Sequence, residues 1–338
     1  MSTARKILKW TGVSVAVLLL AGGIFQQAGT MLDSRFAAPG SEMFTVDGHR
    51  IHVACLGQGS PTYVLDGGLG AWSVHWWRVQ AYLAKSGRAC AVDRPGEGWS
   101  DAFGAGHDGA SAADELARVV KAANIVMPFW YVGHSLGANF AQVFYAKYPE
   151  QIAGMVLIEP GNPKDLLEDF HGSRAQAMNA PECGASCLAA GAAGYLGITR
   201  LVALSARGAH FPGAWRDQYR AGLARPSHWI NVVANFDALP ATAYQDSDVN
   251  SFRDTPLLIF DSTLPRDPEG KETVADVKVW KRGQLNFLAR LAAKSKDGVG
   301  PIHVPGSNHA TIILGEAQAA FVARTIIHFA GHARSDAR

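Results

Sequence analysis

Charge of one sign, internal repeats and cysteine are all scarce in this 338-residue chain. Its 31 basic and 29 acidic residues leave a formal net charge of only +2. Without a broad electrostatic field, nucleic acids and acidic polymers are not expected partners, and a small or apolar substrate is favoured. No internal repeat is visible, so a repeat architecture is not expected. Hydrophobic residues make up 48% of the chain, which suffices for a sizeable core and predicts a globular protein.

Acidic residues are also missing from the start of the chain, where the first one is Asp33. Arg5, Lys6 and Lys9 precede an uncharged run over residues 10–25, which is a membrane-targeting pattern. The run of about 16 residues exceeds most signal-peptide cores but falls short of the roughly 20 that span a bilayer comfortably. Because no A-x-A pair follows it, we favour an uncleaved signal anchor over a signal peptide for residues 1–26.

Positive charge before the apolar run predicts how the chain is oriented. It keeps the N-terminus in the cytoplasm and sends the following residues across the membrane. We therefore expect membrane attachment through the apolar segment, with the folded part on the periplasmic side. Secretion after signal cleavage is the alternative. Residues 27–41, rich in small and polar side chains, are expected to form a stalk. The sequence does not predict an oligomeric state.

The few cysteines gain importance in an oxidising compartment, where disulfides persist. Cys55 lies in the strand-like segment "RIHVACLG" and Cys90 in "GRACAVDR", so neighbouring strands would permit a bridge. Cys183 and Cys187 would close a small loop. Four buried thiols without bonds are the alternative. A C-x3-C pair without companion histidines is a weak zinc signal, and we expect no metal.

Strands alternate with helices over most of the chain. Short β-like runs bounded by glycine begin at residue 42, and buried-strand runs such as "RACAVD" and "PFWYV" then alternate with the helical segments "HWWRVQAYLAKSG" and "AADELARVVKAAN". Because parallel strands need crossover connections, this order predicts a mostly parallel sheet after an antiparallel start. Between Gly161 and Thr255 only helical fragments occur, which indicates a lid over the strand ends.

The stretch "VGHSLGA" places Ser135 between Gly133 and Gly137, after one apolar run and before another. A strand that leads directly into a helix forces the intervening residue into a tight turn, which only small neighbours tolerate. The turn projects the Ser135 hydroxyl at the carboxyl edge of the sheet and leaves the Leu136 amide free at a helix N-terminus. Ser135 is therefore a candidate nucleophile. A serine that merely caps the helix is the alternative.

A serine nucleophile needs a base within hydrogen-bond reach. We select His309 in "VPGSNHATII", because it lies in a loop after a strand and thus near the same sheet edge. Other histidines are placed less well: His134 lies inside the turn, His303 within a strand, and His328 and His332 on or after the last helix.

Together these residues resemble the α/β-hydrolase fold family, specifically its bacterial ester and peptide hydrolases with a helical cap. The turn 133–137, the glycine turn "DGGLGAW", the motif "DRPGEGWSD" and the loop histidine occur in the family's order over residues 44–331. The resemblance implies a mostly parallel eight-stranded sheet flanked by helices. It divides the chain into a core over residues 42–160 and 256–332 and a cap over residues 161–255.

The resemblance also implies a mechanism that needs no cofactor. Ser135 would attack a carbonyl carbon while His309 takes its proton, giving an acyl-enzyme. Two backbone amides would stabilise the oxyanion, those of Leu136 and Leu69. Gly67 stands where the family usually has histidine, which leaves the register of the second donor open by one residue. The G-x-G in "GLGAWS" lacks the fuller fingerprint of a dinucleotide site.

The carboxylate that orients the histidine is less well defined. The family's usual position follows the strand "TPLLIF", where Asp261 and Asp267 are candidates. Some relatives place the acid one strand earlier, and here Glu159 ends "GMVLIEP". We favour Glu159, because a carboxylate that closes an apolar run needs a partner, and a histidine is a suitable one. It also stays open that none of these three residues is the carboxylate that orients the histidine. The motif "DRPGEGWSD" is not expected to supply a catalytic residue.

The expected activity is hydrolysis of an ester or related acyl bond in a small molecule. An aminopeptidase or amidase is the alternative, with Glu168 or Asp217 as the acidic group that would bind a free amine. A non-catalytic binding protein on the same fold is the alternative from another class. Trp72, Trp76 and Trp77, beside the glycine turn, would either line the acyl pocket or pack in the core.

Overall fold

The computed structural model describes residues 3–33, 35–36, 40–102, 107–168, 170–179, 184–206, 208, 210–264 and 273–335. Within them, eight strands form one sheet in the order β1-β2-β4-β3-β5-β6-β7-β8. The strands are β1 (Ser41–Val46), β2 (His49–Leu56), β3 (Thr62–Asp66), β4 (Arg88–Val92), β5 (Phe129–His134), β6 (Ile152–Ile158), β7 (Leu257–Ser262) and β8 (Gly298–Val304).

Only β2 runs opposite to the other strands of the sheet. β2 pairs antiparallel with both β1 and β4, whereas β4, β3, β5, β6, β7 and β8 pair parallel in that order. The central strands β3 and β5 are buried at every position, as expected for strands covered on both faces. This arrangement confirms the predicted eight-stranded, mostly parallel sheet.

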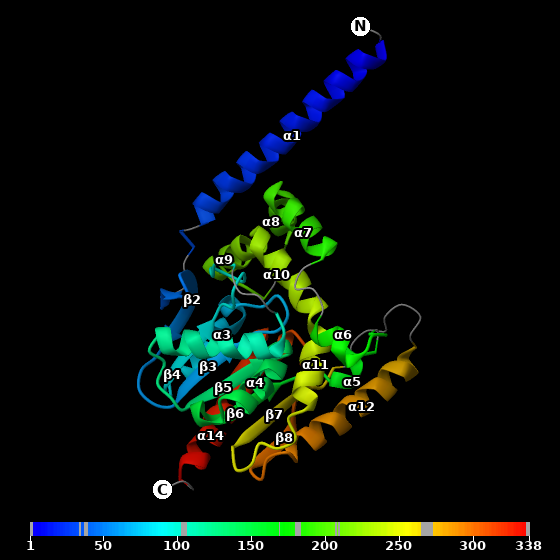
Figure 1. Ribbon diagram of the computed structural model, residues 1–338. Helices are drawn as coiled ribbons and strands as arrows, with labels where there is room; N and C mark the ends of the chain where they lie inside the picture. The colour runs from blue at the N-terminus through cyan, green and yellow to red at the C-terminus, as the bar shows by residue number, and fades with distance from the viewer. Residues whose placement is uncertain are drawn as a thin grey trace.

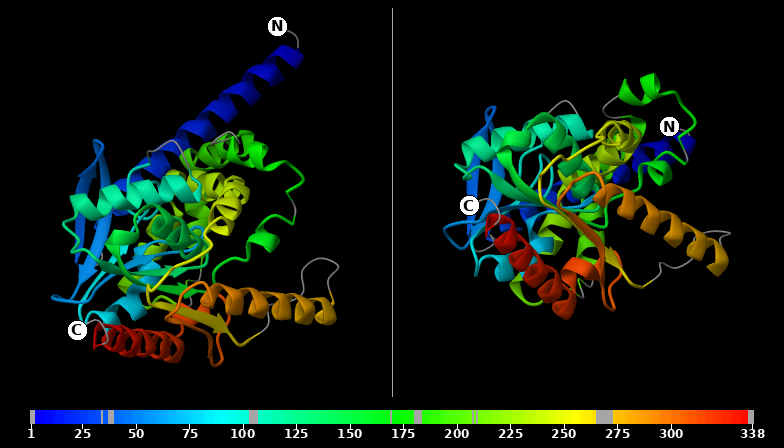
Figure 2. Two further views of the ribbon diagram at one scale, coloured as in Figure 1. Left: turned by 60° about the horizontal axis from the view of Figure 1, so that its bottom comes forward. Right: turned by 90° about the horizontal axis from the view of Figure 1, so that it is seen from below.

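Helices cover both faces of the sheet (Figures 1 and 2). One buried cluster joins the sheet to α3 (Gly109–Ala122), α4 (Leu136–Lys147) and α12 (Val274–Ala292). A second joins the opposite face to α2 (Trp77–Leu83) and α14 (Glu316–Ser335). Three single-turn helices complete the part of the core that the structure describes: η1 (Ser73–Trp76), η2 (Pro149–Gln151) and α13 (Thr311–Leu314). The two layers fix the carboxyl ends of the parallel strands at one edge.

Seven helices separate β6 from β7 in the described residues. They are α5 (Pro163–Leu166), α6 (Arg174–Met178), α7 (Ala185–Tyr195), α8 (Ile198–Ser205), α9 (Ala214–Leu223), α10 (Pro226–Asp237) and α11 (Leu239–Ser247). Polar contacts tie this helical insert to the core. The Asn231 side chain donates to Glu97 Oε1 at 3.1 Å, and the Gly109 amide donates to Thr242 Oγ1 at 3.0 Å.

The N-terminal helix α1 (Thr3–Asp33) projects from the rest of the molecule (Figure 1). It is long and apolar enough to cross a membrane. The helix continues through residues 27–33, where the sequence predicts a stalk. Its last turns are held by Arg200 of α8, which forms an ion pair with Asp33 at 2.8 Å. Contact with the insert thus extends the helix beyond its apolar run.

A disulfide joins Cys55 of β2 to Cys90 of β4. The two residues are direct partners in the antiparallel register, so their Cβ atoms face each other. The predicted bridge is therefore confirmed for this pair. Cys183 lies outside the described residues, so its expected pairing with Cys187 stays a prediction.

Candidate active site

Ser135 occupies the junction between β5 and α4, with φ 53° and ψ −123°. A positive φ is strained for a residue with a side chain, typically by about 1–3 kcal/mol, and such residues gather at functional sites. The flanking glycines allow the chain to pass, because a Cβ at Gly133 would overlap the carbonyl of Gly137, and one at Gly137 would overlap that of Asp66. The sharp strand-to-helix turn therefore has the geometry that the sequence predicts.

His309 and Glu159 meet beside this turn. His309 lies five residues beyond the end of β8, and Glu159 follows β6 directly. The Nδ1 of His309 lies 2.8 Å from Glu159 Oε2, and the other carboxylate oxygen accepts the Ser262 amide at 2.8 Å. Glu159 also has a positive φ of 48°, the second strained backbone position at this edge of the sheet. Both carboxylate oxygens are thus held, and the imidazole is oriented through Nδ1.

Burial and hydrogen bonding act in opposite directions on the carboxyl of Glu159. Burial alone would raise its pKa, but the His309 hydrogen bond and charge, together with the Ser262 amide, outweigh this and lower the pKa to about 2. Glu159 is therefore ionised at neutral pH. A buried carboxylate against an imidazole stabilises the positive charge that the ring would acquire on accepting a proton.

Ser135, Glu159 and His309 line one cavity of about 590 Å³. Among the described residues, no hydrogen bond joins Ser135 Oγ to the His309 ring. Such bonds are often long in unliganded enzymes and shorten when substrate binds. Other lining residues come from the start of the insert and from α12, and include Asn162, Asp165, Leu166, Trp280, Lys281 and Gln284. A volume of this size suits a small-molecule ligand.

Asp261, the alternative acid, is engaged elsewhere. Its Oδ1 accepts from Lys281 Nζ at 2.6 Å, and its Oδ2 lies 3.0 Å from His303 Nδ1. The carboxylate is fully buried at the end of β7, so these two partners account for both of its oxygens. The structure brings Glu159, not Asp261, to His309. Asp267, the other alternative, lies outside the described residues.

The proposed oxyanion donors lie on either side of Ser135. Leu136 is the first residue of α4, where a backbone N–H has no intrahelical partner. On the other side, a Cβ at Gly68 would lie 2.9 Å from Ser135 Cβ and 3.3 Å from its Oγ, so the glycine turn passes directly against the serine. The Gly68 carbonyl accepts from Arg94 Nη2 at 2.7 Å. In a trans peptide the Leu69 N–H then points away from Arg94.

Arg94 is thus the residue of "DRPGEGWSD" that shapes the site. Besides Gly68, its guanidinium holds the Gly67 carbonyl at 2.6 Å and the Asp66 carboxylate at 2.6 Å. Asp93, from the same motif, accepts the Ser73 amide and pairs with the buried His52 at 2.8 Å. The motif therefore orders the loops under the site.

His134 has a role that the sequence analysis missed. Its Nε2–H donates to the backbone carbonyl of His309 at 2.9 Å, and the two rings lie 4.7 Å apart. Burial, and to a smaller extent the neighbouring His309, lower the pKa of His134 to about 3, so the ring is neutral. The residue before the nucleophile thus positions the backbone of the candidate base. The only signal in the sequence is its place inside the turn.

The tryptophans beside the glycine turn pack in the core. Trp72 and Trp76 are almost completely buried, and Trp72 stacks on Tyr219 of the insert with ring centroids 5.7 Å apart. Neither they nor Trp77 line the large cavity, which instead has Trp280 in its wall. Of the two interpretations from the sequence, core packing is the one that the structure supports.

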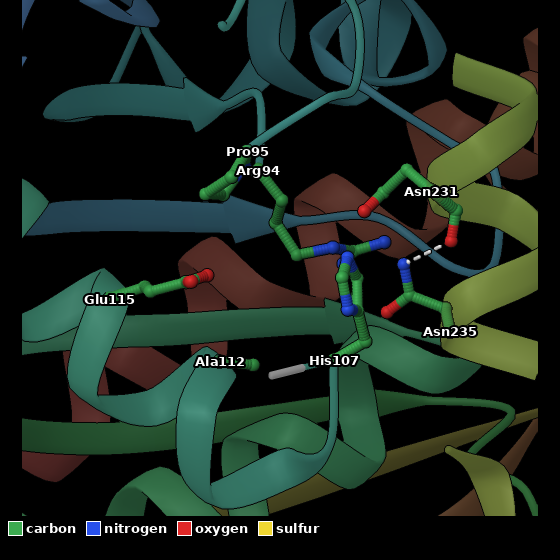
Figure 3. A pocket seen from close by; sticks show the side chains of 7 residues that line it. All are labelled: Arg94, Pro95, His107, Ala112, Glu115, Asn231 and Asn235. Atoms are coloured by element: carbon green, nitrogen blue, oxygen red, sulfur yellow. Dashed lines mark hydrogen bonds between the residues drawn. The ribbon is translucent and has the colours of Figure 1, made fainter. Parts of the chain in front are cut away.

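A second, very small cavity lies beside Arg94, between α3 and α10 (Figure 3). Arg94, Glu115 of α3 and Asn231 and Asn235 of α10 point toward it. Its volume of about 10 Å³ has room for about one water molecule. Burial raises the pKa of Glu115 to about 8, although Arg118 and Arg94 oppose the shift. This cavity is too small for a substrate.

Comparison with known proteins agrees with this architecture. A family model described as the alpha/beta hydrolase fold matches residues 63–180. An uncharacterized protein of Schizosaccharomyces pombe is 27% identical over 168 residues, which cover 40% of this chain and 31% of that protein. The chain therefore spans less than a third of this relative.

Two solved structures resemble nearly the whole chain. A candidate lipase from Acinetobacter baumannii has a TM-score of 0.59 at 19% identity, covering 92% of this chain and 97% of that one. A mutant of a candidate epoxide hydrolase from Pseudomonas aeruginosa has a TM-score of 0.63 at 18% identity, covering 87% and 97%. Sheet order, strand-to-helix turn and these similarities agree: the chain has the α/β-hydrolase fold.

Proposed function

We propose that this protein is a serine hydrolase that cleaves an ester or related acyl bond through an acyl-enzyme. One observation carries the proposal: a serine on a strained strand-to-helix turn and a histidine held by a buried carboxylate line the same cavity. These are the parts that activate a weak nucleophile. None of the steps requires a metal or an organic cofactor.

In the first step, Ser135 Oγ attacks the carbonyl carbon of the substrate and His309 Nε2 accepts the hydroxyl proton. Glu159 keeps the Nδ1 proton in place and stabilises the imidazolium. The backbone amides of Leu136 and Leu69 donate hydrogen bonds to the tetrahedral oxyanion, and each stabilises the transition state by on the order of 3 kcal/mol. Collapse breaks the bond to the leaving group, which takes the proton from His309.

In the second step, water replaces the leaving group. His309 removes a proton from the water, whose oxygen attacks the acyl carbon of the ester on Ser135. Collapse releases the carboxylic acid and returns the proton to Ser135 Oγ. The neutral His134 holds the His309 backbone throughout, and adds no charge that would compete for protons.

Serine at the nucleophile position favours acyl transfer over the chemistry of the epoxide hydrolases among the similar structures. The resemblance implies that epoxide hydrolases and haloalkane dehalogenases use an aspartate there. For an aminopeptidase, neither Glu168 nor Asp217 lines the cavity. Of the acidic side chains that do, Glu159 is held by His309, and Asp165 accepts a hydrogen bond from Trp280 Nε1 at 2.8 Å. The cavity therefore favours an ester without a free amine.

Membrane attachment through α1 is part of the proposal. The helix is long and apolar enough to cross a membrane, and basic residues precede its uncharged run. This pattern would place the hydrolase domain on the periplasmic side. A disulfide between Cys55 and Cys90 suits an oxidising compartment.

Labelling with a fluorophosphonate tests the proposal. We expect the full chain to be labelled and Ser135→Ala to be unlabelled, with Ser251→Ala, an exposed serine away from the cavity, as the matched control. A panel of acyl esters of increasing chain length, with matching amides and lactones, would then define the bond that is cleaved. An unlabelled wild-type chain that is folded would favour the non-catalytic binding protein.

A further inference from the structure

Helix α1 has a free part and a docked part. Every residue from 3 to 21 is exposed, and contact with the rest of the chain begins at Gly22. The uncharged run begins at Trp10, so the apolar stretch of this free part covers residues 10–21 and is about 18 Å long at about 1.5 Å per residue, shorter than the ~30 Å hydrocarbon core of a bilayer. An α1 that crosses the bilayer from Trp10 onward must therefore carry part of its docked segment into the membrane, which brings the insert beside it to the bilayer.

The docked part of α1 rests on α7, α8 and the end of α9. A Cβ at Gly22 would overlap the Leu196 carbonyl in the link between α7 and α8, so the helix and this link touch backbone to backbone. Further along, Gln26 accepts from Arg200 Nε at 3.3 Å and donates to the Ala224 carbonyl at 3.0 Å. Buried polar bonds of this kind fix the orientation of the helix on the insert.

Helix α8 is amphipathic, but its polar face packs against the protein and its apolar face points outward, the reverse of what is expected in water. Its buried residues are Thr199, Arg200 and Ala203, with Arg200 only 7% exposed. Its large apolar residues point outward instead: Ile198, Leu201, Val202 and Leu204 are 50%, 60%, 48% and 59% exposed. A helix that buries its arginine and exposes its leucines is suited to an apolar surrounding rather than to water.

Helix α7 continues this apolar surface. Leu188 and Tyr195 are 78% and 65% exposed, and α7 contains no charged residue. The two helices together are apolar enough to enter a membrane, but the chain bends by 73° between them. They therefore form a corner and not a straight span. In α8 the only charge is Arg200, which Asp33 neutralises at 2.8 Å.

We propose that the outer faces of α7 and α8 form a membrane-contact surface that inserts into the bilayer beside the point where α1 leaves it. This inference rests on the proposed membrane attachment by α1. The occupant is lipid, because the docked helix brings the exposed leucines to the membrane surface and no acidic or lysine side chain on either helix opposes insertion.

The contact leaves the candidate active site open. The large cavity is walled by α5 and α12, and the views of Figures 1 and 2 place α12 well away from α7 and α8. The insert would thus be held at the surface by three helices, none of which supplies a lining residue of the cavity. An insert that contacts the bilayer through these helices would also fix the height and tilt of the hydrolase domain above the membrane.

Depth measurements on the full chain in lipid nanodiscs test the inference. A fluorophore would be attached through Leu201→Cys or Leu204→Cys, with Leu18→Cys on the free part of α1 as the lipid control. Val279→Cys on α12, at 57% exposure, is the matched water control. The quencher is a nitroxide carried on the lipid acyl chain. We expect quenching at positions 201 and 204 to be at least threefold stronger than at 279.

Quenching at 201 and 204 no stronger than at 279, with strong quenching at 18, would overturn the inference and leave membrane attachment intact. No quenching at 18 would overturn both. Efficient oxidative cross-linking between two copies of the Leu204→Cys variant would also overturn it, in favour of a second copy as the occupant. Fluorophosphonate labelling of Ser135 reports separately on the proposed activity, and circular dichroism melting checks that each variant is folded.

Discussion

His309 and Glu159 lie 150 positions apart in the sequence, and their side chains hydrogen bond at 2.8 Å across the end of the sheet. The strand between them in the sheet, β7, ends in another carboxylate, Asp261, whose oxygens are occupied by Lys281 and His303. Two carboxylates on neighbouring strand ends thus have separate partners. This division predicts separate consequences for their removal.

Exchange of the two carboxylates for amides should separate activity from stability. Glu159→Gln should lower kcat/KM by about 10²–10⁴-fold, because an amide at this position no longer stabilises the imidazolium. Asp261→Asn should change kcat/KM by less than about tenfold but lower the free energy of unfolding by about 1–3 kcal/mol, because it leaves the partly buried Lys281 unpaired. Ester kinetics and urea unfolding measure the two effects. The reverse ranking in activity would move the candidate acid to β7.

The choice between these acids shows where sequence reasoning ends. Ser135 and Leu136 follow from local chain geometry, and His309 from its place after the last strand. Glu159 and Asp261 are equivalent by such rules, since Ile158 and Phe260, the residues before them, pair in register. Lys281 decides between them, and it comes from a helix whose approach to β7 no local pattern specifies.

The insert was predicted only in outline for the same reason. Its helical character follows from composition, but its packing depends on contacts between distant segments. The segment "CLAAGAAGYLGITRLVAL" has the pattern of one helical fragment, yet it divides into α7 and α8 where Gly197 adopts φ 80°. Likewise, α1 continues to Asp33 because Arg200 of the insert holds its last turns.

Gly68→Ala should impair activity more than folding. The new methyl group would lie 2.9 Å from Ser135 Cβ, so the glycine turn or the serine must shift by several tenths of an ångström. Because small displacements of reacting groups are costly, we expect kcat to fall by about 10- to 100-fold. Gly283→Ala on α12, where nothing lies within 4 Å, is the matched control and should retain wild-type rates. Equal rates for the two variants would place the oxyanion site elsewhere.

Removal of the disulfide should destabilise the core without changing the site. The bond links residues 35 positions apart, for which the chain-entropy relation gives about 4 kcal/mol. We expect the Cys55→Ala/Cys90→Ala double variant to lose about 2–4 kcal/mol of unfolding free energy in urea, with kcat unchanged. Reduction of the wild-type protein should lower its unfolding midpoint in the same way. The double variant has no bond between positions 55 and 90, so the loss of this bond cannot contribute to any effect of reduction on it.

Glu115 should make the protein less stable as the pH rises. Its pKa in the folded state is raised to about 8 by burial, from an ordinary value of 4.5. The folded state therefore binds the proton more tightly than the unfolded state. The resulting stability is fully present below pH 4.5 and is lost as the pH rises toward 8, with a slope of at most about 1.4 kcal/mol per pH unit. Burial likewise raises the pKa of Glu97 and Asp246 to about 7, which adds to the trend.

Glu115→Gln isolates this contribution, because glutamine fills the same space beside Arg94 and cannot ionise (Figure 3). We expect the variant and the wild type to unfold at similar urea concentrations at pH 5, and the variant to be more stable by about 1–3 kcal/mol at pH 8. Glu168→Gln, an exposed position, is the control and should follow the wild type at both values. A wild-type stability that rises between pH 5 and 8, or a variant whose advantage is greatest at pH 5, would contradict a neutral Glu115. In that case the buried guanidinium of Arg94 would have to hold Glu115 ionised in addition to Asp66.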